Sequence, residues 1–412
     1  MTTKKHSISF DDVLNREQRG FTSMVKPVGS LCNMRCKYCY YLDKKNLYGG
    51  KEPLMDDNLL EKYVQNTIEG NNAPVINFVW HGGEPLMAGK EFFKKAIKLQ
   101  NKYAQGRKIE NSIQTNGLLI DREWCSFFKD NNFLVGISID GPQSIHDMHR
   151  LDSEGRGTWS RVMNAINLMY QTGTQYNTLS TINVHSEGKA DEVYLFLRQI
   201  SSFMQFLPVS ELTLNQIVCS PENLDAKIAP WSVSARGFGE FMCRIFDIWV
   251  TNDVGKRFVQ LFDATLANHL QVPPSICSLC ETCGTGLTVE HNGDVYACDH
   301  FVYPEYKLGN IKDTPLCELA VSKQQFEFGI MKRETLSQQC RRCKYFSLCF
   351  GECPKHRFVR DKNDDFSLNS LCGGYKMFFE HSWPYMIYMK EMLLKKKAPA
   401  LVMEKARKEI SL

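Results

Sequence analysis

Three cysteines, Cys32, Cys36 and Cys39, lie in one short segment with the spacing C-x3-C-x2-C. Three thiols are an odd number for disulfides and one fewer than the four ligands that a structural zinc ion usually takes. Three thiolates suit a [4Fe–4S] cluster whose fourth iron stays open to another ligand, and Arg35 and Lys37 would lower the thiol pKa values and offset the cluster charge. The alternative is a zinc knuckle that a distant His or Cys completes.

Nine further cysteines form clusters between residues 277 and 372, whereas four others, including Cys317 within the same range, are scattered singly. The chain has no signal-peptide pattern, so we expect its thiols to be reduced, and clustering on this scale favours metal, either iron–sulfur or two zinc sites. The scattered four, which we expect to be buried apolar residues, are Cys125, Cys219, Cys243 and Cys317.

Composition indicates an ordinary globular protein. The chain has 412 residues, 43% hydrophobic and 23% charged, with a net charge of +4. This mild charge, without a basic stripe, does not suggest a nucleic-acid partner. The first twenty residues lack the apolar core of a signal peptide, and no window approaches the roughly 18 apolar residues of a membrane helix. We therefore expect a cytoplasmic protein with no membrane partner.

The cysteine loop must be positioned by regular elements, and strand patterns alternate with helical patterns up to about residue 220. This alternation predicts an α/β fold with a parallel sheet. Six strands are too few for a closed eightfold barrel, so we expect an open or partial barrel. The predicted strands span 24–29, 76–83, 111–117, 134–141, 179–185 and 212–218, and the helices span 56–70, 90–104, 121–132, 158–173 and 190–203.

Polar or glycine-rich loops follow four of these strands: the cysteine loop, HGGEP (81–85), QTNG (114–117) and SIDGP (138–142). Since ligand sites in such sheets lie at the carboxyl ends of the strands, we expect the four loops to converge. Beyond the barrel, Asn292-Gly293 predicts a hairpin with a type I′ turn. The expected divisions are an extension (1–20), the barrel (21–232), a connecting helical segment (233–276), a cysteine-rich domain (277–375) and a helical tail (376–412).

The opening motif, with Tyr38 before its last cysteine and GGEP after the second strand, resembles the signature of the radical S-adenosylmethionine (SAM) superfamily. The resemblance implies a partial (β/α)6 barrel in which the open iron binds the methionine part of SAM. The reduced cluster then cleaves SAM to a 5′-deoxyadenosyl radical.

The same resemblance implies a set of SAM contacts. Tyr38 would lie near the adenine and Gly83 beside the methionine, while Ser138 and Arg150 match positions that hold the carboxylate and ribose. Ile217 would pack on the adenine from the last strand. The alternative is that none of these residues binds SAM: Ser138 would cap a helix, Arg150 would be solvated and Ile217 would be an ordinary core residue.

The later cysteines resemble the SPASM extension of radical SAM enzymes, which carries two auxiliary [4Fe–4S] clusters. GDVYACDH and GECPKHRF are similar to the anaerobic sulfatase-maturating enzymes, and the likeness runs from about residue 20 to 390. Cys280 departs from the family spacing and is assigned to neither auxiliary cluster. The implied ligands are Cys277, Cys283, Cys298 and Cys353 for the first auxiliary cluster, and Cys340, Cys343, Cys349 and Cys372 for the second.

By this resemblance the chain would oxidise a Cys or Ser of a sulfatase precursor, within a C/S-x-P-x-R motif, to Cα-formylglycine. The radical would remove a β-hydrogen while Asp299, next to Cys298, takes the proton from sulfur or oxygen. An auxiliary cluster would accept the remaining electron, and flavodoxin or ferredoxin would supply electrons. The alternatives are an enzyme that crosslinks a small precursor peptide and a zinc-stabilised binding protein. His81, His291 and His300 are expected to be loop residues without a role.

Overall fold

We describe the fold from a computed structural model, which places residues 20–49, 54–215, 217–223, 225–360 and 366–410. The extension expected at residues 1–20 lies outside this part of the chain, apart from Gly20. Within these ranges, no helix is both long enough and apolar enough to span a membrane.

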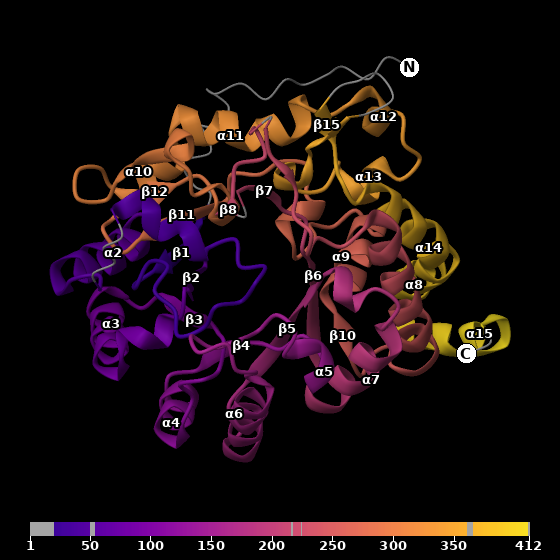
Figure 1. Ribbon diagram of the computed structural model, residues 1–412, viewed down its shortest axis with the longest axis horizontal. Helices are drawn as coiled ribbons and strands as arrows, with labels where there is room; N and C mark the ends of the chain where they lie inside the picture. The colour runs from indigo at the N-terminus through magenta and orange to yellow at the C-terminus, as the bar shows by residue number, and fades with distance from the viewer. Residues whose placement is uncertain (1–19, 50–53, 216, 224, 361–365, 411–412) are drawn as a thin grey trace.

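Six parallel strands form the centre of the fold, and each is connected to the next through a helix. They pair in chain order, and Figure 1 shows them following one another around an arc. This arrangement confirms the partial (β/α)6 barrel. The strands are β1 (Thr22–Lys26), β2 (Val75–Trp80), β3 (Lys108–Thr115), β4 (Phe133–Ser138), β5 (Tyr176–Ile182) and β6 (Phe203–Pro208).

The prediction of the sixth strand was wrong. Residues 212–218 form β7 (Leu212–Leu214) and β8 (Ile217–Val218), which pair with β9 (Lys227–Ile228) in a small separate sheet. The barrel strand is β6, whose first residue, Phe203, falls at the end of the predicted helix 190–203. That helix stops at Ile200, and the alternation that marks β6 covers too few residues to be distinguished from helical spacing.

Helices cover the outer face of the arc (Figure 1). Two of them begin where the sequence predicts: the Asp56 carboxylate accepts from Leu59 N–H at 2.9 Å, and Asp121 accepts from Trp124 N–H at 2.7 Å. Their buried stripes pack on the sheet through large side chains such as Tyr63. The helices are α2 (Asp57–Glu69), α3 (Lys90–Tyr103), α4 (Arg122–Asp130), α5 (Gln143–His146), α6 (Trp159–Thr172) and α7 (Ala190–Ile200).

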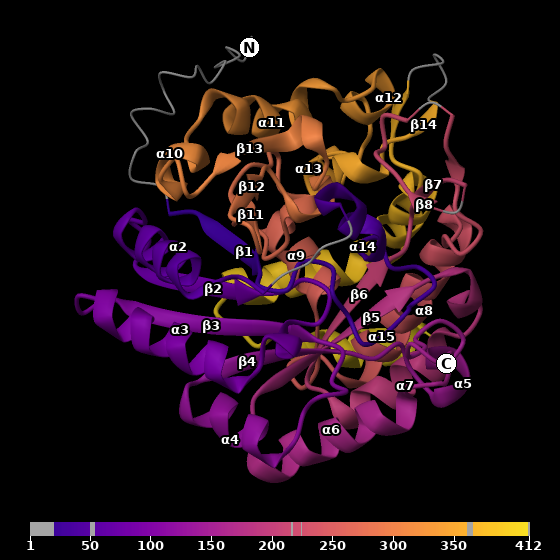
Figure 2. The same cartoon turned by 60° about the vertical axis from the view of Figure 1, so that its left-hand side comes forward.

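The first three strands of the cysteine-rich region continue the barrel sheet. β11 (Gly286–Glu290) lies parallel to β1, with Lys26 opposite Glu290, and is followed by β12 (Asp294–Tyr296) and β13 (Lys307–Asn310). With β10 (Phe258–Val259) at the other edge the sheet has ten strands. Figure 2 shows β11, β12 and β13 beside β1. The pairing therefore fixes the cysteine-rich region against the first barrel strand.

The predicted hairpin is present, but its turn differs from the prediction. A type I′ turn needs positive φ at both central residues. Here Gly293 has φ of +91°, whereas Asn292 does not adopt positive φ. Gly293 N–H donates to Glu290 O at 2.9 Å, and the Asn292 side chain accepts from Asp294 N–H at 3.0 Å. The connection is a three-residue loop that ends in a left-handed glycine.

The remaining helices pack beside and above the barrel (Figure 1). α14 lies on α8, and the two backbones meet at Gly239 and Gly374. A β-hairpin of β14 (Val359–Arg360) and β15 (Phe366–Leu368) lies between the last cysteines. The helices are α8 (Ala235–Asn252), α9 (Gln260–His269), α10 (Leu316–Ala320), α11 (Lys323–Glu334), α12 (Gln338–Arg341), α13 (Phe346–Cys349), α14 (Cys372–Leu394) and α15 (Val402–Glu409).

Candidate active site

The three cysteines of the opening motif lie in the loop after β1. Burial raises the pKa of the Cys32 and Cys36 thiols to about 12 and that of Cys39 to about 11. The Cys32 sulfur accepts from Met34 N–H at 3.3 Å and from the Asn116 amide at 3.7 Å. Three thiols grouped in one loop suit a metal centre, whose positive charge would hold them as thiolates.

The prediction that Arg35 and Lys37 lower the thiol pKa values was wrong. Both side chains are exposed, and Arg35 Nη1 donates instead to the carbonyls of Cys32 and Met34, each at 2.8 Å. The positive charge that opposes the effect of burial on Cys36 is Arg150, which comes from beyond β4. Sequence adjacency therefore pointed to the wrong cations.

The GGEP loop is packed directly against the cysteine loop. A Cβ on Gly83 would lie 2.1 Å from Leu31 O, so only glycine fits there. The buried Glu84 carboxylate accepts from Thr115 Oγ1 at 2.8 Å and from Asn116 N–H at 2.8 Å. Burial raises the pKa of Glu84 to about 7 despite these hydrogen bonds. The loops after β1, β2 and β3 thus meet, as the sequence analysis expected.

Tyr38 and Arg150, two of the predicted SAM contacts, meet at a third residue that the sequence analysis did not name. Asp140, buried after β4, accepts from the Tyr38 hydroxyl and pairs with Arg150 Nε at 3.0 Å. Burial alone would raise the pKa of Asp140, but the Arg150 guanidinium, His146 and the hydrogen bonds from Tyr38 and Thr181 N–H together lower that pKa. Ser138 ends β4 and accepts from the Gln114 amide at 3.2 Å. Asp140 was visible within SIDGP as a carboxylate at a strand end.

Ile217 is not part of this group. It lies on β8 of the small sheet, and 46% of its side chain is exposed. The last barrel strand, from which the sequence analysis expected it to reach the adenine, is β6. A role for Ile217 in binding SAM stays a prediction.

Asp299 follows Cys298 directly and is bound by two side chains of the barrel. Its carboxylate pairs with Lys26 of β1 and accepts a hydrogen bond from the Tyr40 hydroxyl. Lys26 is completely buried. Burial would raise the pKa of Asp299, but Lys26 and the nearby histidines His81 and His300 hold it well below its ordinary value. Asp299 is therefore an anion at the junction of the two regions.

More charged and aromatic side chains surround this pair. Lys26 Nζ lies 3.5 Å from the centre of the Tyr41 ring, and the Tyr41 hydroxyl donates to Glu290. On the other side, Lys355 Nζ lies 4.4 Å from the Tyr40 ring and donates to Glu211 at 2.6 Å. None of these residues was predicted as part of the site. A lysine within the apolar run MVKPV was the one signal, since a buried strand lysine needs a partner.

The four cysteines predicted for the first auxiliary cluster lie close enough to influence one another. Burial raises the pKa of Cys353, and Cys298 and Cys283 raise it further, while Cys298 is in turn affected by Cys277. The buried Lys332 donates to Cys277 O at 2.9 Å and supplies positive charge. Cys280 lies beside this group, where its thiol donates to Ile276 O at 3.5 Å.

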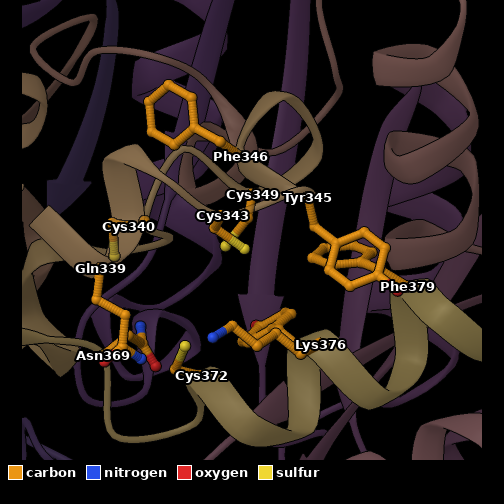
Figure 3. Close-up of a pocket in the computed structure, with 12 residues that line it drawn as sticks. Gln339, Cys340, Cys343, Tyr345, Phe346, Cys349, Asn369, Cys372, Lys376 and Phe379 are labelled. Carbon is orange, nitrogen blue, oxygen red and sulfur yellow. The ribbon is translucent and has the colours of Figure 1, made fainter. Parts of the chain in front are cut away.

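The four cysteines predicted for the second auxiliary cluster line one hollow (Figure 3). Aromatic side chains of Tyr345 and Phe379 form part of its wall, and Lys376 extends into it. Within the described ranges, no three His, Cys, Asp or Glu side chains converge tightly enough to hold a single metal ion. Ligands of a cube are spread around four irons, so such a hollow lined by four thiols suits a cluster.

Comparisons with known proteins identify the family. The Radical SAM superfamily model matches residues 27–197, and the SPASM model, an iron–sulfur cluster-binding domain, matches residues 277–344. The chain is 46% identical over 396 residues to the serine-type anaerobic sulfatase-maturating enzyme of Bacteroides thetaiotaomicron, covering 94% of this chain and 95% of the relative. The chain belongs to the anaerobic sulfatase-maturating enzymes.

The likeness extends through both regions of this sulfatase-maturating family member. This chain is 34% identical over 375 residues to the cysteine-type enzyme of Clostridium perfringens, and the match covers 88% of this chain and 96% of that enzyme. The solved structure of anSMEcpe with bound AdoMet and Cp18Cys peptide superposes with a TM-score of 0.81 at 32% identity, covering 90% of this chain and 99% of that one. The protein is thus a radical SAM enzyme, and its cysteine-rich region is an iron–sulfur domain rather than a pair of zinc sites.

Proposed function

We propose that this enzyme oxidises a Cys or Ser side chain of a sulfatase precursor to Cα-formylglycine. The observation that carries the proposal is the position of Asp299. The residue is attached to Cys298 in the iron–sulfur domain, yet its carboxylate binds Lys26 and Tyr40 of the barrel. Tyr40 follows Cys39 directly, so a proton acceptor lies beside the loop that would start the radical chemistry.

The residues suit three [4Fe–4S] clusters and SAM, because the thiols lie in three groups, one in the loop after β1 and two in the cysteine-rich region. Tyr38, Gly83, Ser138, Arg150 and Ile217 are the proposed SAM contacts. When bound, SAM and the reduced first cluster supply the one-electron chemistry that removes a hydrogen atom from the substrate Cβ, and the auxiliary clusters supply an acceptor for one electron. The cluster ligands remain Cys32, Cys36 and Cys39, then Cys277, Cys283, Cys298 and Cys353, and then Cys340, Cys343, Cys349 and Cys372.

Asp299 acts on the heteroatom of the substrate. The –CH2–XH group, in which X is sulfur or oxygen, loses a hydrogen atom from carbon, a proton from X and one electron, and becomes –CH=X. Asp299 takes the proton. A carboxylate paired with a lysine is a weak base, so we expect the proton to move together with the hydrogen atom, because loss of that hydrogen atom makes X–H more acidic. A thioaldehyde product then takes up water and releases hydrogen sulfide.

The substrate is proposed to be a precursor segment with a C-x-P-x-R or S-x-P-x-R motif. Such a segment must be extended to reach a carboxylate at the junction of barrel and hairpin, so we expect modification before the precursor folds, in the cytoplasm. Flavodoxin or ferredoxin is the proposed electron donor.

The test uses two peptides that differ in one residue, Ser or Cys at the target position of the motif. The anaerobically reconstituted enzyme is incubated with SAM, dithionite and each peptide. We expect an aldehyde, which a hydrazide reagent labels and mass spectrometry locates at the target residue. A product that has lost two hydrogens but resists the hydrazide would instead indicate a crosslink, and no change in either peptide would contradict the proposal.

A further inference from the structure

One strained turn joins Cys349, a proposed ligand of the second auxiliary cluster, to Cys353, a proposed ligand of the first. The three residues between them, Phe350, Gly351 and Glu352, all have positive φ, of +48°, +75° and +54°. Glycine adopts such a conformation readily, whereas a glutamate does so at a cost in backbone energy. The glutamate in this turn therefore needs an explanation from its side chain.

The surrounding chain holds this turn in place. The Arg357 guanidinium donates to the carbonyls of Phe350, Gly351 and Glu352 at 3.0 to 3.1 Å. Its Nη1 atom also donates to Lys332 O of α11 at 2.6 Å. The position of Glu352 is thus fixed by hydrogen bonds from outside the turn.

The Glu352 side chain is buried and connects the two groups of proposed ligands. Its carboxylate accepts from His356 Nδ1 at 2.9 Å and from the Asn369 amide at 2.5 Å. The His356 N–H donates to Cys353 O at 3.1 Å, and Asn369 O accepts from Cys372 N–H at 3.0 Å. Figure 3 shows Asn369 beside Cys372 in the hollow. One carboxylate is therefore bonded to chain segments of both proposed sites.

The charge of this carboxylate also acts on both groups. Burial raises the pKa of the Cys349 and Cys353 thiols, and Glu352 raises it further at each. The potential of an iron–sulfur cluster depends on the charge around it, and a nearby anion makes the cluster harder to reduce. A charge common to both sites moves both potentials in the same direction.

We infer that Glu352 is a positioning residue shared by the two auxiliary sites, which holds their ligand segments together and lowers the reduction potential of both clusters. The inference rests on the proposed function for its two sets of cluster ligands. It assigns Glu352 no contact with the substrate or with SAM.

The test is a redox titration of the reconstituted holoenzyme at pH 8.5, in which electron paramagnetic resonance follows each cluster. Glu352→Gln keeps the size of the side chain but removes its charge, so both auxiliary clusters should be reduced at more positive potentials. The cluster of the opening motif should not shift, because its ligands lie on a separate loop after β1. The Cys32→Ala/Cys36→Ala/Cys39→Ala variant identifies the signals that belong to the auxiliary clusters.

Two further variants separate charge from shape. Glu352→Asp keeps the charge and tolerates positive φ, so its potentials should stay close to those of the wild type. Glu380→Gln removes an exposed carboxylate of α14 that pairs with Lys344 at 2.9 Å, and it should shift no potential because water and salt screen exposed charges. Unchanged potentials in Glu352→Gln, a shift of only one auxiliary cluster, or an equal shift in Glu352→Asp would overturn the inference.

Iron analysis covers the case in which Glu352→Gln does not assemble fully. Loss of about eight irons with SAM cleavage retained supports a residue shared by both sites, and any other loss overturns the inference. Peptide oxidation by the wild type is measured in parallel. If the wild type makes formylglycine while Glu352→Gln shifts neither potential, only this inference fails. If the wild type makes none while both potentials shift, only the proposed function fails.

Discussion

At the scale of single residues, the junction between the two regions depends on one buried ion pair. The Asp299 side chain is 14% exposed and that of Lys26 is 0% exposed, so either charge alone would be costly to bury. The folded-state pKa of Asp299 lies below its value in the unfolded chain. The pair therefore stabilises the fold at neutral pH, and this contribution is lost as the pH falls through about 4 and below.

A double-mutant cycle tests this pair. Lys26→Met leaves a buried carboxylate without its cation and should lower the free energy of unfolding by about 3–5 kcal/mol. Adding Asp299→Asn removes that charge, so the double variant should be at least about 1 kcal/mol more stable than Lys26→Met. Urea unfolding followed by tryptophan fluorescence measures both. Simple additivity of the two substitutions would show that the pair is not coupled.

Cys280 and Cys283 provide a second test at this scale. The Cys280 thiol donates to Ile276 O, whereas Cys283 lies among the thiols that affect Cys353. Cys280→Ser should keep its iron, and Cys283→Ser should lose up to about four irons per chain. Iron analysis after anaerobic reconstitution decides between them, and the reverse result would mean that the ligand set of the first auxiliary cluster is wrong.

At the scale of elements, close helix contacts position the second auxiliary group. α14 begins at Cys372, and two residues later Gly374 lies against the backbone of α8. A Cβ on Gly374 would come within 2.2 Å of Ala235 O. The helix therefore cannot keep its place with any larger residue there, and its first residue is a proposed cluster ligand.

Gly374→Ala should force α14 away from α8 and displace Cys372. We expect the free energy of unfolding to fall by about 1–3 kcal/mol and the iron content to fall by up to about four per chain. Gly373→Ala is the control, because its Cβ would lie at an ordinary 3.7 Å from the Ala235 Cβ. If both variants keep the iron content and urea midpoint of the wild type, the helix contact does not position the cluster site.

Much of this architecture could be predicted from the sequence, and the misses have physical causes. Five barrel strands were found because each is a short apolar run that precedes a periodic helix, and four of them also precede a polar or glycine-rich loop. β6 was missed because residues 203–206 offer one short alternation directly after a helix. The pairing of β11 with β1 joins residues about 264 positions apart; Lys26, for example, lies opposite Glu290. No local sequence pattern encodes such a contact. Asp299 was visible beside Cys298, and Lys26 was visible as a lysine within an apolar run, but nothing in the sequence showed that these two residues and Tyr40 meet.

At the scale of the whole molecule, one sheet runs through the barrel and the iron–sulfur domain. The opening motif and the later cysteines nevertheless lie on separate loops, so they should bind metal independently. The Cys32→Ala/Cys36→Ala/Cys39→Ala variant should retain about eight of about twelve irons. It should no longer cleave SAM, whereas the wild type does. Iron analysis and chromatography of 5′-deoxyadenosine check this, and retained cleavage would exclude the opening motif as the radical site.

The central claim is that a carboxylate on the iron–sulfur domain completes a reaction begun in the barrel. Asp299→Asn keeps the shape of the side chain but cannot take up a proton, and loss of a general base typically costs about 10²- to 10⁴-fold. The decisive measurement is the ratio of formylglycine to 5′-deoxyadenosine formed by the Asp299→Asn enzyme with a C-x-P-x-R peptide. We predict continued 5′-deoxyadenosine formation with little or no formylglycine, whereas formylglycine at the wild-type rate and ratio would contradict the account.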